Sequence, residues 1–384
     1  MSRATLSLGN FFFSLFVALV GYILFLYLST LVSTTEAGLV VALGALLSLV
    51  AFPFLPRLSA RYHPRQMVVY LSLFTTALLV ALVATETIVA TVLIVALIVA
   101  IQPILSYELD LLFEAMLLNP DGAGTARSAF LTAFNLAIIL SPLVVAAILA
   151  SRGGTYEHIF LLGAVSVGML GVLFSSKRAV AMTAKQPEAF FDTISCLSHD
   201  KDLRATIFGH FLLYLFFVWA PLYTPIYLHV VLGIPWSTLG PIFAIILIPY
   251  IVLEYPIGWL ADNVLGDKEM MAAGFILAGG ALAALGGVTT TTSITTIVVI
   301  LFISRIGTAL VESTNEAHFF RRVSAKDINS VSIFRGVWPL ANLVAPLIGS
   351  AVLLFGSYPL LFFVAGGSIA LLGTFATLRI TDFR

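Results

Sequence analysis

A series of long apolar runs limits this chain more than any other feature of its sequence. Twelve runs of roughly 20 mostly apolar residues follow one another, each bounded by turn residues or charges. A helix of that length matches the hydrocarbon core of a membrane. The chain is 60% hydrophobic and only 10% charged, whereas a soluble domain carries roughly a quarter charged residues. We therefore expect an all-α integral membrane protein with twelve transmembrane helices.

The expected spans fall into two sets of six. They are 8–32, 37–56, 66–85, 89–117, 127–151 and 157–176, then 205–231, 238–260, 269–289, 293–319, 329–355 and 358–379. The first run is too long for the core of a signal peptide, so we interpret it as a retained helix. These limits predict an N-terminal six-helix bundle over 1–176, a linker between the bundles over 177–204, and a C-terminal six-helix bundle over 205–384.

The second half of the chain repeats the first at an offset of about 204 residues. The aligned pairs include Glu108 with Glu312, Phe130 with Phe334, Pro142 with Pro346 and, at an offset of 203, Arg65 with Lys268. A constant offset across several apolar segments indicates a duplicated bundle. In membrane proteins, such paired bundles surround a substrate site near the middle of the bilayer. The repeat therefore predicts two pseudo-symmetric bundles around a central site.

Basic residues predict the orientation of the spans. With twelve spans, sixteen Lys and Arg residues fall on one side of the membrane, which we call the basic side, and only Arg152 falls on the other. Cytoplasmic loops carry an excess of Lys and Arg, so we expect the basic side to be cytoplasmic. Both termini and the 177–204 linker would then be cytoplasmic, in a plasma or inner membrane.

The loop after the eighth segment carries the clearest local motif. It reads Gly258-Trp-Leu-Ala-Asp262-Asn-Val-Leu-Gly266-Asp-Lys268. This resembles the Gly-x-Leu-Ala-Asp-x-x-Gly-x-Lys/Arg loop of the major facilitator superfamily, with one extra residue before the second glycine. The copy after the second segment keeps its basic residues but has Ser59 in place of the aspartate. Late prolines in segments 5 and 11, Pro142 and Pro346, are similar to a signature of antiporter members that also carries a glycine, which is missing here.

The resemblance implies a fold and a mechanism. It implies the twelve-helix fold of that superfamily, with segments 1, 4, 7 and 10 lining a central cavity and the bundles alternating access to it. It also implies that Asp262 latches the cytoplasmic side by approaching the start of segment 5, near Gly122–Ser128. Ser59 puts the equivalent latch in the first half in doubt.

Ionisable residues within the expected spans mark a candidate site, because a charge at the bilayer centre costs roughly 2.5–3.5 kcal/mol. Segments 4 and 10 hold most of them: Gln102, Glu108, Asp110 and Glu114, and then Arg305, Glu312 and Glu316. A carboxylate that has lost its water holds a proton more readily, which suits a proton-carrying role for Glu108 or Glu312. The alternative is that they lie nearer the cytoplasmic mouth and pair with loop arginines such as Arg127 or Arg321.

The spacing on segment 10 places Arg305, Glu312 and Glu316 on one helical face. Our hypothesis is that a buried arginine beside a carboxylate exchanges partners when a proton or a substrate arrives. The alternative is a static ion pair that holds two helices together. Arg305 also resembles the mid-helix arginine of an Arg-x-x-Gly motif in the family, although here the spacing is Arg305-Ile-Gly307 and the residue lies in the second half.

A second group of side chains indicates the kind of cargo. Aromatic and amide residues occur on segments 5, 7 and 11, namely Asn135, Tyr214, Tyr223, Trp338 and Asn342. A cavity with aromatic walls and few charges suits a small organic, amphipathic solute. Aromatic residues are equally common on surfaces that face lipid, so a lipid-facing position is the alternative.

Motifs for other functions do not occur in the sequence. There is one cysteine, Cys196, no Cys/His spacing typical of a metal site, and no Gly-x-x-x-x-Gly-Lys-Ser/Thr loop for ATP. Nineteen basic and nineteen acidic residues cancel, so no net charge points to nucleic acid. We expect no catalytic residue, metal or cofactor, and a monomer whose partners are the bilayer, a small solute and protons.

Together these patterns predict a secondary transporter that is proton-coupled, with export by antiport favoured over import. One alternative is an importer or facilitator of a sugar, organic acid or peptide, with Arg305 binding a carboxylate. A second is a membrane sensor or scaffold that transports nothing, and a third is a polytopic membrane enzyme, which the missing motifs disfavour.

Overall fold

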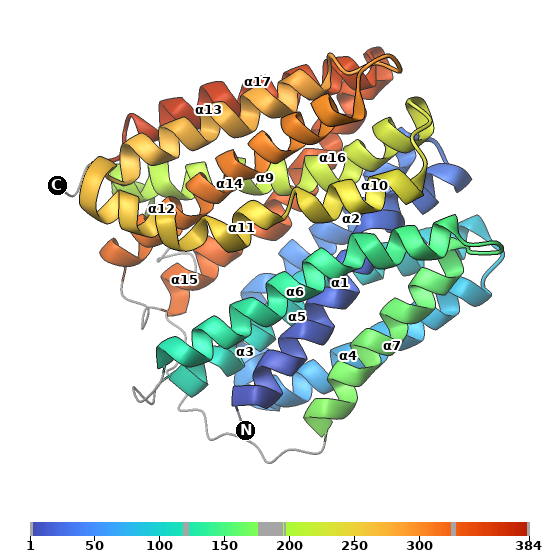
Figure 1. Ribbon diagram of the computed structural model, residues 1–384. Helices are drawn as coiled ribbons and strands as arrows, with labels where there is room; N and C mark the ends of the chain where they lie inside the picture. Colours follow the sequence, from blue (N-terminus) through green and yellow to red (C-terminus); the bar gives the residue numbers. More distant parts are fainter. Residues whose placement is uncertain (1–2, 118–122, 176–194, 196, 324–327, 382–384) are drawn as a thin grey trace. The chain divides into compact units, whose positions relative to one another are not determined.

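The structure is a computed structural model that describes residues 3–117, 123–175, 195, 197–323 and 328–381. Every regular element within these ranges is a helix, and eleven of the helices are long and apolar enough to cross a membrane. The chain forms two compact units, which Figure 1 shows coloured along the sequence. Unit 1 comprises Met1–Gln186 and Pro235–Ala244, and unit 2 comprises Pro187–Ile234 and Ile245–Arg384. The expected all-α membrane class is confirmed.

Unit 1 is built on the first six apolar segments. Its helices are α1 (Arg3–Leu31), α2 (Thr34–Ala51), η1 (Phe52–Phe54), α3 (Leu55–Tyr62), α4 (Pro64–Ala84), α5 (Ile88–Leu117), α6 (Ala123–Ala150), α7 (Tyr156–Ser175) and α10 (Trp236–Ile245). Helix α1 packs on α6 and α7, α4 packs on α7, and α5 packs on α2 and α4, as Figure 1 shows for α4 and α7. Buried aromatic side chains such as Phe16 and Phe160 fill the core. Each apolar segment thus buries one face against neighbouring helices and leaves another apolar face for lipid.

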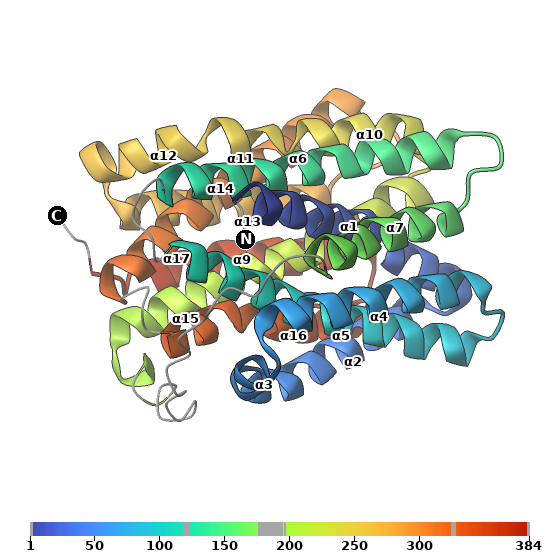
Figure 2. The same cartoon turned by 90° about the horizontal axis from the view of Figure 1, so that it is seen from below.

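Unit 2 holds the remaining helices. They are α9 (Lys201–Pro225), η2 (Ile226–Val231), α11 (Ile248–Val252), α12 (Glu254–Leu260), η3 (Ala261–Leu265), α13 (Asp267–Leu285), α14 (Ile294–Arg322), α15 (Ile328–Arg335), α16 (Val337–Phe355) and α17 (Tyr358–Thr377). Helix α13 packs along α14 and α17, and α9 packs on α14, α16 and α17 (Figure 2). A Cβ atom on Gly274 would lie 2.7 Å from the Gly307 carbonyl oxygen, so only small residues allow α13 and α14 to approach this closely.

Prolines divide two of the expected spans. The spans 238–260 and 329–355 were expected as single helices, but the first is divided into α10, α11 and α12 and the second into α15 and α16. A proline lacks the N–H that would bond the carbonyl four residues earlier, and its ring clashes with that carbonyl. Three helices end four residues before a proline: α10 before Pro249, α11 before Pro256 and α15 before Pro339. The helices are interrupted at these points, whereas Trp236–Val252 and Ile333–Phe355 each remain one apolar helical stretch.

The start of α9 also differs from the expected span, which began at residue 205. The helix begins at Lys201, because the Asp200 carboxylate caps it by accepting the backbone N–H groups of Asp202 at 2.8 Å and Leu203 at 3.2 Å. Most of the expected 177–204 linker lies outside the described residues.

The sequence repeat appears again in the contacts at the helix ends. In unit 1 the Arg65 guanidinium donates to the last carbonyls of α7, at 2.7 Å to Phe174 and 2.9 Å to Ser175. In unit 2 the repeat-related Lys268 donates to the carbonyl of Leu378, at the end of α17, at 3.4 Å. A cation at a helix C-terminus satisfies free carbonyls and opposes the negative end of the helix dipole. The aligned basic residues thus perform the same structural task in both units.

Candidate functional site

Glu108 is the most deeply buried acid of the expected central site. It lies on α5 and its exposed fraction is 0%. The Ser59 hydroxyl on α3 donates to its Oε1 atom at 2.5 Å, and the same hydroxyl oxygen lies 2.8 Å from the Leu55 carbonyl. The second carboxyl oxygen, Oε2, has no hydrogen-bond partner within the described residues. An ionisable group that is buried with one oxygen unpaired is costly, which marks it as a candidate for function.

Arg305 lies in a different environment, among aromatic side chains of unit 2. Its guanidinium carbon lies 5.1 Å from the centre of the Phe216 ring on α9, a cation–π distance. Its Nε atom is buried without a hydrogen-bond partner, and Arg305 forms no ion pair, in the part of the chain that the structure describes. One turn further along α14, the Thr308 hydroxyl shares a 2.5 Å hydrogen bond with Tyr250, whose hydroxyl is also near the Arg305 side chain. Arg305 therefore retains capacity to bind an anion.

The three charged residues expected on one face of α14 have three different environments. Arg305 lies against Phe216, and Glu312 is exposed. Glu316 is half-buried and forms an ion pair with Arg335 at 2.8 Å. This ion pair joins α14 to α15 and does not involve Arg305.

The other expected cavity residues divide between surface and core. Gln102, Asp110, Asn135, Tyr214, Trp338 and Asn342 are half-buried. Tyr223 is fully buried on α9 and lies directly against Gly349 of α16, so its ring contributes to helix packing in this conformation. The side chain of Glu114 lies outside the described residues.

The loop motif adopts a backbone that explains its extra residue. Residues Ala261–Leu265 form a π-helical turn, in which the N–H of Gly266 bonds the carbonyl of Ala261 at 3.1 Å. Such a turn holds one residue more than an α-helical turn. Gly266 then starts α13 with φ +91°, a conformation that glycine adopts readily. The side chain of Asp262, the residue Gly122 and the side chains at the start of α6 lie outside the described residues, so the latch stays a prediction.

A buried ionic network that our sequence reasoning missed lies at the basic side of unit 2. His318 of α14 lies between two carboxylates, 2.8 Å from Asp202 and 3.5 Å from Asp267. Arg322 pairs with Asp202 at 2.6 Å and Arg321 pairs with Asp267 at 2.5 Å. The exposed fraction of the side chain is 1% for His318, 7% for Asp202 and 3% for Asp267, so these three are shielded from water, whereas Arg321 and Arg322 are 37% and 25% exposed.

This network connects the ends of four helices. Asp202 starts α9, Asp267 starts α13, and His318 with Arg322 ends α14. Asp202 also accepts the backbone N–H of Thr381, after α17, at 2.6 Å. The signal in the sequence was the placement of acids at helix starts and bases at a helix end, which favours the helix dipoles.

Comparison with known proteins supports the same class. The chain matches the family model described as Major Facilitator Superfamily over residues 6–314 and 232–382. It is similar to the crystal structure of a mutant of the nucleoside transporter NupG, with a TM-score of 0.77 and 14% identity, covering 99% of this chain and 100% of that one. It is also similar to the human organic anion transporter MFSD10 (TETRAN), with a TM-score of 0.66 and 16% identity, covering 98% of each chain. No curated protein sequence matches the chain.

Proposed function

The chain belongs to the major facilitator superfamily and is a membrane transporter of a small solute, and from that premise we propose that it moves an organic anion by proton-driven alternating access. The observation that carries this proposal is the pair of unsatisfied polar groups, one per unit. Glu108 in unit 1 supplies the proton site, and Arg305 in unit 2 supplies the anion site.

The contacts of Glu108 support a reversible proton site. The Ser59 hydroxyl has one proton but lies within bonding distance of two oxygens, Glu108 Oε1 and the Leu55 carbonyl. When Glu108 is protonated, its O–H donates to Ser59 Oγ and the serine proton donates to Leu55, so both bonds form at once. When Glu108 is ionised, one of the two bonds is lost and a charge stays buried. The surroundings of Glu108 therefore stabilise its protonated form and are less favourable once the proton has left. This difference suits coupling of proton release to a conformational change.

The surroundings of Arg305 support an anionic cargo. A guanidinium presents donors in a planar fork that matches a carboxylate. Stacking on Phe216 orients Arg305 and leaves donors such as Nε available. One of the similar structures is described as an organic anion transporter, which agrees with this assignment.

Export in exchange for protons is the direction that we propose. The late helix prolines Pro142 and Pro346 lie inside α6 and α16, at the positions that resemble the antiporter signature. Uptake of the same anion together with a proton is the second candidate, because a site with one acid and one arginine serves either direction.

The test is solute flux in proteoliposomes under an imposed pH gradient. A panel of labelled carboxylates, nucleosides and sugars is supplied on each side in turn, which separates exchange from co-transport. We expect carboxylate flux that follows the gradient, and we expect Arg305→Ala to abolish it while Arg305→Lys keeps part. Arg152→Ala, on the opposite side from the other basic residues, is the control and should leave flux unchanged.

Three outcomes would contradict parts of the proposal. Solute flux that is independent of the pH gradient would contradict proton coupling. Flux of neutral solutes without flux of carboxylates would contradict the assignment of Arg305 as an anion site. If no solute in the panel is moved or bound, a sensor or scaffold on this fold replaces the transporter.

A further inference from the structure

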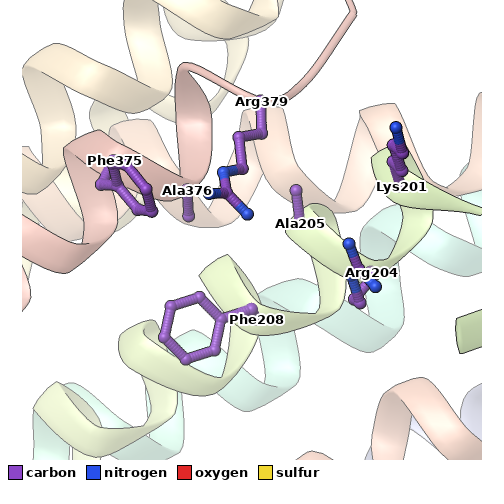
Figure 3. Close-up of a pocket in the computed structure, with 7 residues that line it drawn as sticks. All are labelled: Lys201, Arg204, Ala205, Phe208, Phe375, Ala376 and Arg379. Atoms are coloured by element: carbon purple, nitrogen blue, oxygen red, sulfur yellow. The ribbon is translucent and has the colours of Figure 1, made fainter.

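A shallow basic groove lies at the end of unit 2 where α9 begins and α17 ends. Its volume is about 660 Å³, and Figure 3 shows the side chains around it. The lining residues are Lys201, Arg204, Ala205, Phe208, Phe375, Ala376 and Arg379. The two alanines are buried and form the floor, whereas the three basic and two aromatic side chains are exposed. The groove thus combines positive charge with apolar surface.

The positive charge of the groove is not neutralised within the described residues. Lys201, Arg204 and Arg379 form no ion pair there. Among the described residues, the two acids at the start of α9 are already engaged, because Asp200 pairs with Arg322 at 3.6 Å and Asp202 accepts bonds from Arg322 and His318. Three cations gathered without an acid repel one another, so an anion placed among them is attracted.

The apolar part of the groove continues onto the surface that faces lipid. Phe208 is 39% exposed and Phe375 is 51% exposed, although both lie on membrane-spanning helices. The Arg379 guanidinium carbon lies 4.4 Å from the centre of the Phe375 ring, at the boundary between the charged and apolar parts. One turn of α17 deeper, Leu371 is 74% exposed. A small soluble anion would leave this apolar surface uncovered, whereas the acyl chain of a lipid would cover it.

We propose that this groove binds the headgroup of an anionic phospholipid from the leaflet on the basic side. The phosphate would lie between Arg204 on α9 and Arg379 just after α17, both drawn in Figure 3. The acyl chains would run along Phe208 and Phe375. Basic pockets between transmembrane helices on the cytoplasmic side are suited to such headgroups. Because Arg204 belongs to α9 and Arg379 follows α17, the lipid would hold these two helices together.

Native mass spectrometry of the full chain in detergent tests the proposal. The protein is titrated with phosphatidylglycerol, cardiolipin or phosphatidylethanolamine, and the bound lipids are counted. The test variant is Arg204→Gln with Arg379→Gln. The control is Arg57→Gln with Arg61→Gln on α3, which removes the same charge from exposed positions and also removes a cation near an aromatic ring, since Arg61 lies 5.4 Å from the centre of Tyr62.

We expect the unmodified protein to bind one anionic lipid more tightly than the rest and more tightly than phosphatidylethanolamine. The test variant should lose roughly 30-fold in affinity for that lipid, since each Lys or Arg contributes about 1 kcal/mol and 1.4 kcal/mol is tenfold. The control variant should bind as the unmodified protein does. Thermal unfolding of each variant without added lipid checks that the exposed substitutions leave the fold intact.

Three results would overturn the proposal. Equal losses in the test and control variants would indicate general surface charge rather than a site. If phosphatidylethanolamine binds as tightly as the anionic lipids, the cations do not select an anionic headgroup. Full displacement of the lipid by millimolar inorganic phosphate or glycerol phosphate would show that the groove binds a soluble phosphate instead.

Discussion

The two units use their buried polar groups in different ways, although their sequences repeat. Unit 1 has a single buried carboxylate, Glu108, bonded to one serine and otherwise unpaired in the described residues. Unit 2 has a network at its basic side in which His318 and two arginines contact the carboxylates of Asp202 and Asp267. A network of ion pairs holds helix ends in one arrangement, whereas a carboxylate without an ion pair is poised to change its protonation state.

The residues at matching positions explain this difference. Glu108 and Glu312 are aligned, yet Glu108 is fully buried and Glu312 is exposed. Position 59 is a serine in the first copy of the loop motif, where the second copy has Asp262. The serine lets a buried carboxylate approach without charge repulsion, which an aspartate would cause. Loss of the acid in the first copy therefore has a positive consequence: it makes room for a neutral hydrogen bond to Glu108.

The largest expected effect comes from removing the Glu108 proton site. Glu108→Gln keeps the size of the side chain and its hydrogen bond to Ser59 but cannot take up a proton. We expect solute flux driven by a pH gradient to fall to background, while exchange of labelled for unlabelled solute at equal pH continues. The measurement is the same proteoliposome assay run with and without the gradient.

Glu312→Gln is the matched control, because it makes the same change at the aligned position. Glu312 is exposed, so its loss should reduce driven flux less than the loss of Glu108. If Glu312→Gln abolishes driven flux and Glu108→Gln does not, the roles of the two units are reversed and the proton site lies in unit 2.

The next effect in size concerns the stability of the ionic network. Asp202→Ala removes the acceptor for His318, Arg322 and Thr381 together, and it leaves buried donors without a partner. Breaking a buried ion pair costs about 3–5 kcal/mol. We expect a clearly lower Tm for the detergent-solubilised protein. Ser59→Ala, which removes one neutral bond in unit 1, should cost only about 1 kcal/mol. Equal Tm values for the two variants would remove the contrast between the units.

Much of the fold could be predicted because apolar length and repeat offset are strong signals. The helix breaks at Ile245, Val252 and Arg335 were not predicted, although each lies four residues before a proline. The apolar runs continue through these prolines, so hydropathy alone predicts unbroken spans. Proline spacing alone does not locate the breaks, because Pro142 and Pro346 lie inside α6 and α16 without dividing them.

The environments of the site residues were harder to predict. Helical spacing placed Arg305, Glu312 and Glu316 on one face, but spacing does not reveal which neighbouring helix each side chain meets. The ionic network brings together residues more than 100 positions apart, such as Asp202 and His318. Contacts of this kind depend on tertiary packing, which local sequence patterns do not predict.

A smaller effect on stability is expected from the turns that precede α4 and α13, which are the third transmembrane helices of the two repeats. Gly266 has φ +91° before α13, whereas the aligned His63 has φ +61° before α4. A side chain in such a conformation costs about 1–3 kcal/mol. Gly266→Ala should therefore lower the Tm, and His63→Gly should raise it unless the lost bond from Arg65 N–H to His63 Nδ1, at 3.3 Å, offsets the gain. Thermal unfolding of both variants measures this, and a lower Tm for His63→Gly would show that its side chain outweighs the strain.

The smallest expected effect is the difference in stability that the two helix caps contribute. Arg65 makes two short bonds to the end of α7, at 2.7 and 2.9 Å, whereas Lys268 makes one long bond to the end of α17, at 3.4 Å. Removing a charged donor from a helix C-terminus costs about 0.3–1 kcal/mol, and a well-formed bond to a charged group contributes more than a long one. Arg65→Ala should lower the Tm more than Lys268→Ala, and Lys268→Arg should raise it if the longer fork reaches a second carbonyl. A larger loss for Lys268→Ala would mean that the motif lysine acts through a contact other than the cap, because the cap alone is the weaker of the two.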